Sequence, residues 1–352
     1  MDYFSWLVYG IFMVIACALA YKTERKNYDP VWLGITYLFV VVFWGIRYKI
    51  GFDYVGYMEI FEALKYSTWP LVEPGYKVIN WIFVSSEIGY VWVMFTMAAL
   101  SYFFLFKVFV REKIFLYGIF FSLAFQFQFM LASQMRQALV ISAFLYALHF
   151  IEVRKYWRYA LFMAFMMLFH YTAGFMIAAL IMARIKIPSW GWLCMIIGAY
   201  GLLLSGVSGM LGNKLLMALP FYQLYLSSDN STMTTALEEG FSIVLFFWVV
   251  VALYLLLYRK TINRPELFNI YMIGIVLYIV FVEFHLLNRM LRYFTLINII
   301  LASILCRNNF RQGILLLIIS FLAFNLLTLK IPNYYGIQPY QTIFEQKVER
   351  YK

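Results

Sequence analysis

Long apolar runs separated by short loops constrain this chain more than any other feature of its sequence. The runs lie near residues 3–21, 30–46, 88–109, 114–131, 134–151, 159–170, 171–183, 190–207, 241–258, 267–284, 293–306 and 312–328. With 64% apolar and only 13% charged residues, the chain has too few polar side chains to cover a surface exposed to water. The pattern therefore predicts an all-α integral membrane protein, a polytopic bundle of about 12 transmembrane helices, some of them short.

The basic residues of the loops predict how the chain is oriented in the membrane. On one side of the membrane, the alternate loops and span ends carry sixteen basic residues (Lys and Arg) and five acidic residues (Asp and Glu). The other side carries twelve basic and twelve acidic residues. By the positive-inside rule the basic side is cytoplasmic, and both termini then lie outside. The alternation requires 159–183 to be a hairpin of two short helices, which we favour over one long helix. The net charge of +11 is thus a topology signal and indicates no nucleic-acid partner.

We expect residues 1–352 to form one polytopic domain with three outer-face segments that are too long for tight turns. These segments are 47–87, 208–240 and the tail 329–352. In the first of them, Tyr54, Tyr57 and Phe61 line one side of a predicted helix over 54–65, as in an amphipathic helix at the membrane interface. A second short helix is predicted to start at the turn Glu73-Pro74-Gly75-Tyr76.

Charges that topology leaves unexplained gather at the outer ends of the predicted spans. They are Arg47, Asp53, Glu73, Arg136, Glu283, Arg289 and Arg292, with His170 and His285 nearby. Guanidinium groups pair with phosphate oxygens and stay charged, so four arginines brought together predict a pocket for an anionic ligand. These residues could also have purely structural roles. Arg47 could be an interfacial anchor, Asp53 a helix cap, and His170 a hydrogen-bond partner for a broken helix end.

The sequence predicts no metal site and no cofactor. Cys17, Cys194 and Cys306 lie far apart in apolar runs, with no spacing that is typical of a disulfide or a zinc site. No Walker loop or paired-aspartate nucleotide signature appears in the chain. A pocket for an anionic ligand at the membrane interface therefore favours a lipid-linked phosphate over a nucleotide sugar.

An ordered set of motifs resembles the EpsG/Wzy-like polysaccharide polymerases over nearly the whole chain. The set consists of Arg47-x3-Gly51-x-Asp53-Tyr54-x2-Tyr57-x3-Phe61, Glu73-Pro74-Gly75-Tyr76, Ser133-Gln134-Met135-Arg136-Gln137, Phe169-His170-Tyr171-Thr172-Ala173, Arg289-x2-Arg292-Tyr293 and Pro339-Tyr340-x2-Ile343-Phe344. One departure is Tyr171, where small residues are frequent in that family.

The resemblance implies a GT-C-like, metal-independent glycosyltransferase in the bacterial cytoplasmic (inner) membrane. It would polymerise undecaprenyl-diphosphate-linked oligosaccharide repeat units into O-antigen or exopolysaccharide on the outer face. The partners would be that lipid-linked oligosaccharide, the lipid bilayer and a chain-length regulator protein.

This chemistry assigns roles to the residues at the outer face. Stabilising the leaving diphosphate is the main task, and arginines can do so without a metal. Binding of the diphosphate or the sugar is expected from Arg47, Arg136, Gln137, Arg289, Arg292, Tyr54 and Tyr57, and catalysis from Asp53, His170 and Glu283.

Two rival functions stay open: a flippase or transporter of the lipid-linked unit, and an O-antigen ligase-type transferase. A transporter would place its charges near the bilayer midplane.

Overall fold

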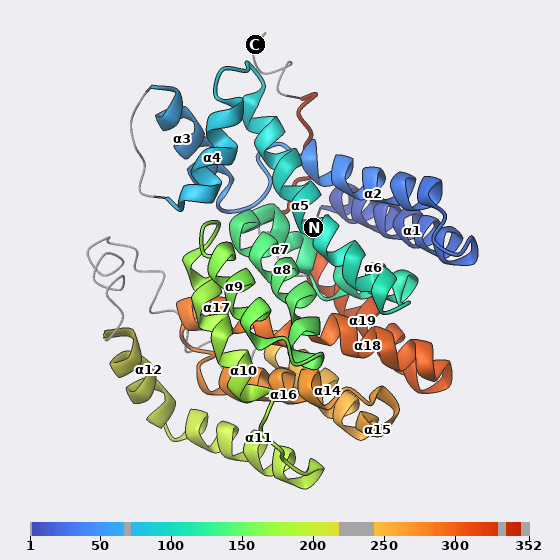
Figure 1. Ribbon diagram of the computed structural model, residues 1–352, viewed down its shortest axis with the longest axis vertical. Coiled ribbons are helices and arrows are strands. Elements are labelled where there is room, and N and C mark those ends of the chain that lie inside the picture. The colour runs from blue at the N-terminus through green and yellow to red at the C-terminus, as the bar shows by residue number, and fades with distance from the viewer. Residues whose placement is uncertain (1, 67–71, 218–242, 330–335, 346–352) are drawn as a thin grey trace. The chain divides into compact units, whose positions relative to one another are not determined.

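The computed structural model describes residues 2–66, 72–217, 243–329 and 336–345 (Figure 1). In these ranges the regular secondary structure is helical, with one isolated antiparallel bridge between Arg47 and Thr342. The prediction of an all-α chain is therefore confirmed. The chain groups into two compact units, residues 1–177 with 302–352 and residues 178–301. That they act as one membrane domain stays a prediction, and each unit is described by itself.

Most of the helices belong to the first unit. They are α1 (Tyr3–Arg25), α2 (Pro30–Gly45), α3 (Tyr54–Lys65), α4 (Pro74–Phe83), α5 (Gly89–Arg111), α6 (Phe115–Ala124), α7 (Phe127–Ser133), α8 (Met135–Glu152), α9 (Tyr156–Met166), the 3-10 helix η1 (Tyr171–Ala178) and α19 (Phe310–Leu329). The second unit holds α10 (Ala179–Met182), α11 (Ser189–Leu204), α12 (Val207–Met217), α14 (Ile243–Leu257), α15 (Arg259–Ile262), α16 (Pro265–Val280) and α17 (His285–Thr295). Helix α18 (Asn298–Asn308) crosses the boundary between the two units.

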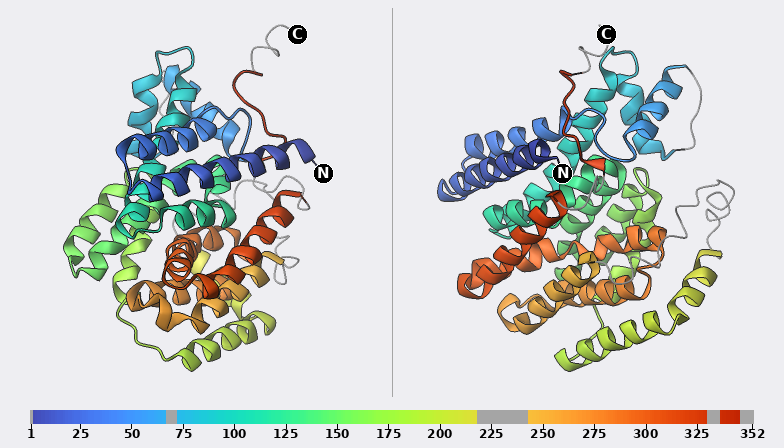
Figure 2. Two further views of the ribbon diagram at one scale, coloured as in Figure 1. Left: turned by 90° about the vertical axis from the view of Figure 1, so that its right-hand side faces the viewer. Right: turned by 180° about the vertical axis from the view of Figure 1, so that it is seen from behind.

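The first unit is built around α5 and α8, which pack against each other. Helix α2 packs on α5 and runs side by side with α1, as Figures 1 and 2 show. Gly45 permits the close approach of α2 to α5, since a Cβ atom there would lie 2.6 Å from the ring of Phe95. Large buried side chains such as Trp44 and Tyr102 fill the space between these helices.

The predicted membrane character agrees with the helices, whereas the number of crossings is not confirmed. Among the described residues, three helical stretches are long and apolar enough to span a bilayer: Tyr3–Arg25, Gly89–Arg111 and Leu287–Asn308. The bent pair α6–α7 would add a fourth. Six further apolar helices have only 10–17 residues, shorter than the roughly 20 that a straight crossing needs. The count of about 12 spans therefore stays a prediction.

The run 114–131, predicted as one span, is divided into α6 and α7 in the structure. The two helices meet at an angle of 57°. Between them Gln126 adopts a left-handed conformation with φ of 67°, which ends an α-helix. No proline marks this break in the sequence, so the apolar pattern alone could not reveal it.

The run 159–183 turns back on itself, as the alternation of charges predicted. Helix α9 ends at Met166, and η1 begins at Tyr171. The hydroxyl of Tyr159 donates a hydrogen bond to the carbonyl of Met176 at 2.5 Å, so the two segments lie antiparallel. The prediction of two short helices that meet near His170 is confirmed.

Both short helices predicted between α2 and α5 are present. Helix α3 has the predicted bounds, and Tyr54, Tyr57 and Phe61 form its buried side. Helix α4 starts at Pro74, with Glu73 at its N-cap position. Of the other two outer segments, residues 218–242, 330–335 and 346–352 lie outside the described residues.

Candidate functional site

The loop after α2 carries Arg47 and is held between two distant parts of the chain. On one side, Tyr48 N–H donates to the carbonyl of Gln341 at 2.9 Å, and Ile343 N–H donates to the carbonyl of Ile46 at 2.9 Å. On the other side, Gly51 packs on the end of α7 with φ of +101°, and a Cβ atom there would lie 2.2 Å from the carbonyl oxygen of Ala132.

The C-terminal segment 336–345 is itself anchored to the start of the chain (Figure 2). Tyr340 N–H donates to Ser5 Oγ at 2.6 Å, and the hydroxyl of Tyr9 donates to the carbonyl of Ile337 at 2.7 Å. The ring of Tyr340 also contacts that of Tyr9, with 5.5 Å between centroids. The two ends of the chain thus position the loop of Arg47 together.

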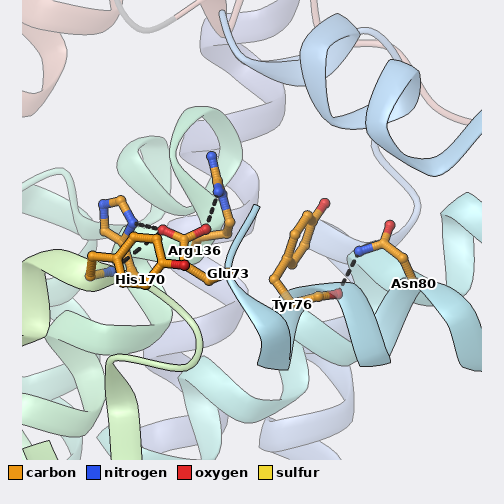
Figure 3. A network of polar contacts seen from close by, with 6 residues as sticks. Glu73, Tyr76, Asn80, Arg136 and His170 are labelled. Carbon is orange, nitrogen blue, oxygen red and sulfur yellow. Dashed lines mark hydrogen bonds and ion pairs between the residues drawn. The ribbon is translucent and has the colours of Figure 1, made fainter. Parts of the chain in front are cut away.

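Glu73, Arg136 and His170 form a network of polar contacts at three helix ends (Figure 3). Glu73 precedes α4, Arg136 lies in the first turn of α8, and His170 lies between α9 and η1. Arg136 Nη1 donates to Glu73 Oε2 in an ion pair, and His170 Nδ1 lies 2.7 Å from Glu73 Oε1. Three charged or titratable side chains far apart in sequence are therefore brought into one cluster.

The backbone supports this cluster. Gly75 N–H donates to the carbonyl of Leu168 at 2.7 Å, which fixes the start of α4 against the turn that bears His170. Tyr171 N–H, at the start of η1, donates to Glu73 Oε1 at 3.4 Å. Glu73 thus also satisfies a backbone donor that a helix start leaves without an intrahelical partner.

Glu73 is ionised in this cluster although it is only 3% exposed. Burial by itself would raise the pKa of its carboxyl, but the hydrogen bond with His170 and the charge of Arg136 outweigh burial and lower the pKa to about 2. A carboxylate at Nδ1 favours the tautomer with the proton on that nitrogen, in which Nε2 is the basic nitrogen. The contact therefore prepares His170 to accept a proton at Nε2.

Two tyrosines hold the guanidinium of Arg136. Its centre lies 5.3 Å from the ring centroid of Tyr57 on α3 and 5.4 Å from that of Tyr76 on α4. The two rings contact each other edge to face at 5.7 Å. Such cation–π contacts fix the direction of the guanidinium and tie both short helices to the start of α8.

Arg47 has surroundings of a different kind, because its side chain is 1% exposed and lies outside the Glu73 cluster. Its Nη1 donates to the carbonyl of Trp44 at 2.5 Å, and its Nη2 lies 3.8 Å from Met135 Sδ. Burial lowers the pKa of Arg47, an effect that the nearby tyrosines Tyr90, Tyr54, Tyr57 and Tyr76 oppose. Among the described residues, no carboxylate lies within ion-pair distance of it.

The other predicted site residues are placed as follows. Tyr54 and Tyr57 are buried on α3, and Gln137 is 3% exposed on α8 next to Arg136. Asp53 stands at the N-cap position of α3, but its side chain makes no capping hydrogen bond.

Three predicted residues belong to the second unit. Glu283 lies between α16 and α17, and Arg289 and Arg292 lie one turn apart on α17. Their joining the cluster of the first unit stays a prediction.

Glu73 is among the charges that topology leaves unexplained, but no role in the site was predicted for it from the sequence. The available signal was an acidic residue directly before the proline that starts a helix, in a segment otherwise apolar. In the described part of the chain, no group of three or more His, Cys, Asp or Glu side chains is arranged to hold a metal ion.

Comparison with known proteins identifies one family. The model of the EpsG family matches residues 31–342, which is most of the chain. No curated protein and no solved structure matches the chain.

Proposed function

Because the chain belongs to the EpsG family, we propose that it is a glycosyltransferase that polymerises undecaprenyl-diphosphate-linked repeat units. The product would be O-antigen or exopolysaccharide, formed at the outer face of the bacterial cytoplasmic membrane. A polysaccharide-related membrane enzyme agrees with the family and with the apolar helices. The observation that carries the proposal is the contact of the His170 ring with an ionised, buried carboxylate.

The reaction needs one proton acceptor and one stabilised leaving group. A hydroxyl of the incoming repeat unit attacks the anomeric carbon of the growing chain, and the bond from that carbon to the lipid diphosphate breaks. The hydroxyl proton passes to His170 Nε2, while the bonding electron pair leaves with the diphosphate. A positioned base of this kind contributes about 100-fold to 10,000-fold in rate.

Glu73 supports His170 in two ways. Its carboxylate, 2.7 Å from Nδ1, holds the imidazole in one orientation and stabilises the imidazolium that forms during the reaction. This contact favours His170 over Asp53 as the base. Arginines would stabilise the charge of the departing diphosphate in place of a metal ion. Arg289, Arg292 and Gln137 are proposed to bind substrate, and Glu283 to support the second unit's arginines.

Reconstitution tests this function directly. The full chain in proteoliposomes is given one purified lipid-linked repeat unit, and the products are resolved by gel electrophoresis and mass spectrometry. We expect a ladder of lengths from the wild type and none from His170→Gln. The control is His149→Gln, at a histidine in the last turn of α8, and it should also give a ladder.

The same experiment separates the rival functions. Absence of a ladder with a competent substrate overturns the polymerase. Movement of the intact lipid-linked unit across the bilayer would identify a flippase, and transfer of the glycan to a different acceptor would identify a ligase.

A further inference from the structure

An apolar groove lies on the first unit where α1, α6 and α19 pack against one another, three helices that Figures 1 and 2 show side by side. Its volume is about 380 Å³, within the roughly 300–1,000 Å³ that is usual for small-molecule sites. Ile318 and Phe321 in its wall are each 49% exposed, so the groove opens to the outside of the helix bundle. The residues that line it include Cys17 of α1, Leu116, Tyr117 and Phe120 of α6, and Ile318 and Phe321 of α19. A groove with such walls on a membrane protein fits a hydrocarbon chain.

Each of the three helices leads from this groove to a basic residue. On α1, Arg25 lies eight residues after Cys17 and therefore on the same helix face. On α19, Arg311 lies seven residues before Ile318, which again places both residues on one face. Lys113 lies just before the start of α6, three residues from Leu116. The groove therefore has a basic end made by Arg25, Lys113 and Arg311.

Hydrogen bonds hold the three helix ends together. The N–H of Phe115, the first residue of α6, donates to Glu24 Oε1 near the end of α1 at 3.2 Å. Arg307, which lies shortly before α19, donates from Nη1 to the carbonyl of Glu112 in the turn before α6. The basic residues therefore converge on one place and are not spread along the surface.

The positive charge at this end is not neutralised by the protein. Among the ion pairs of the described residues, none involves Arg25, Lys113 or Arg311, and all three side chains are exposed. The two carboxylates nearby are engaged in other contacts, Glu24 with the start of α6 and Glu112 with Arg111 Nε at 3.0 Å. The three cations are therefore available to an anion from outside the chain.

We propose that the groove and its basic end form a binding site for one anionic phospholipid. An acyl chain occupies the groove between α1, α6 and α19, and the phosphate lies among Arg25, Lys113 and Arg311. The basic loops predict this side of the membrane to be cytoplasmic, and basic pockets between helices on that side suit anionic headgroups. The site goes beyond the proposed function and shares no residue with the Glu73 cluster.

The length of α1 favours a phospholipid over the polyprenyl substrate as the occupant. Helix α1 has 23 residues, so it is about 35 Å long, close to the thickness of the hydrocarbon core. Ser5 at its start contacts Tyr340 of the segment that pairs with the loop of Arg47, whereas Arg25 lies at its other end. A lipid whose diphosphate is held near that loop cannot also place it at the basic end. A phospholipid of the opposite leaflet has its phosphate at the right depth.

Native mass spectrometry of the full-length protein tests the site. The protein, stripped of lipid in detergent, is given equal amounts of dioleoyl phosphatidylglycerol and dioleoyl phosphatidylcholine, which have the same acyl chains. We expect the wild type to retain one phosphatidylglycerol at least about tenfold better than phosphatidylcholine, because three basic residues face the phosphate. The preference should shrink at high salt.

Two triple variants of equal net charge separate this site from general attraction to a basic surface. We expect Arg25→Gln/Lys113→Gln/Arg311→Gln to lose the preference for phosphatidylglycerol. The matched control removes three exposed charges from the loop between α8 and α9 and should keep the preference; it is Arg154→Gln/Lys155→Gln/Arg158→Gln.

A second pair of variants tests the groove itself. Ile318→Trp places a large ring in the groove and should weaken retention of both lipids several-fold. Leu315→Trp, at an exposed position of the same helix that does not line the groove, should retain them as the wild type does. Because basic loops also set membrane topology, the first triple variant could fail to insert, and this second pair then keeps the test decisive.

Several results would overturn the inference. They are equal retention of the two phospholipids by the wild type, equal losses from the two triple variants, and wild-type retention by Ile318→Trp. Stronger retention of undecaprenyl diphosphate than of phosphatidylglycerol would assign the groove to the substrate, and a protein dimer in place of a lipid adduct would assign it to a second copy of the chain. Failure of the polymerase would look different, with selective lipid retention but no product ladder.

Discussion

Replacement of Glu73 by glutamine separates the charge of this residue from its shape. The amide has nearly the same size, but it neither pairs with Arg136 as an anion nor stabilises an imidazolium at His170. We expect the variant to be less stable and to lose the polymer ladder. Both effects have the same origin, since Arg136 and His170 contact the two oxygens of one carboxylate.

The magnitude follows from the pKa of the carboxyl. A pKa lowered from 4.5 to about 2 corresponds to about 3 kcal/mol of preferential stabilisation of the charged form at neutral pH. Removal of one member of a buried ion pair typically costs about 3–5 kcal/mol, which agrees with this value. The melting temperature should therefore fall by at least about 5 °C. Turnover should fall by about 100-fold to 10,000-fold, as expected when a base loses its orienting partner.

The assay combines melting in detergent with initial rates of ladder formation in proteoliposomes. Glu59→Gln on α3 is the matched control, because Glu59 is exposed and its charge should matter little. Glu73→Asp keeps the charge and should recover part of the stability. Wild-type melting and a full ladder from Glu73→Gln would refute the reasoning. A lower melting temperature with an unchanged rate per folded molecule would refute the catalytic half alone.

Four further changes have defined outcomes. The difference in melting temperature between wild type and Glu73→Gln should be present above about pH 4.5 and vanish as the pH falls through about 2, because a lowered pKa stabilises only the ionised form. Its loss by pH 5 would contradict this. Gly51→Ala, with φ of +101° and a Cβ 2.2 Å from a carbonyl oxygen, should cost at least about 2 kcal/mol. Gly56→Ala, in the first turn of α3 with open space around the new Cβ, should instead stabilise by about 0.5–1 kcal/mol, and equal effects of the two changes on urea midpoints would contradict this. Ile343→Pro, which removes an N–H that bonds to the loop of Arg47, should lower the rate of polymerisation at least about tenfold, whereas Ile343→Ala keeps the donor and the rate. Polymerisation should continue in excess chelator, and a strict Mg²⁺ requirement would count against stabilisation of the leaving group by arginine.

Local features of the fold could be predicted from the sequence, because their causes are local. The helical spacing of the apolar side chains over 54–65 predicted α3 to the residue. The alternation of basic loops predicted the reversal near His170. The break between α6 and α7 was missed because the run is apolar on both sides of Gln126. Packing against neighbouring helices decides where a helix ends, and a local sequence pattern does not reveal such packing. Helix lengths were therefore harder to predict than helical periodicity.

The site shows the same division. Arg136 and His170 were predicted as separate functional residues, Arg136 because an unpaired arginine among apolar helices is costly. Both residues contact Glu73, which lies 63 residues from Arg136 and 97 residues from His170 in the sequence. No local sequence pattern predicts contacts over such separations. The burial of Arg47 depends likewise on the C-terminal segment, which reaches it from the far end of the chain.

The position of Glu73 explains how one residue serves both the fold and the chemistry. A break such as that between α9 and η1 leaves backbone N–H groups that need acceptors, and a lipid environment offers none. Glu73 Oε1 accepts from Tyr171 N–H at this break and contacts His170 Nδ1 with the same atom. A glutamine oxygen can still accept the backbone N–H, so Glu73→Gln should keep the helix break and lose mainly the charge. Glu73→Ala would lose both, and its melting temperature should lie below that of Glu73→Gln. The difference between the two variants therefore measures the contribution of the backbone contact, and Glu73→Gln against the wild type measures that of the charge.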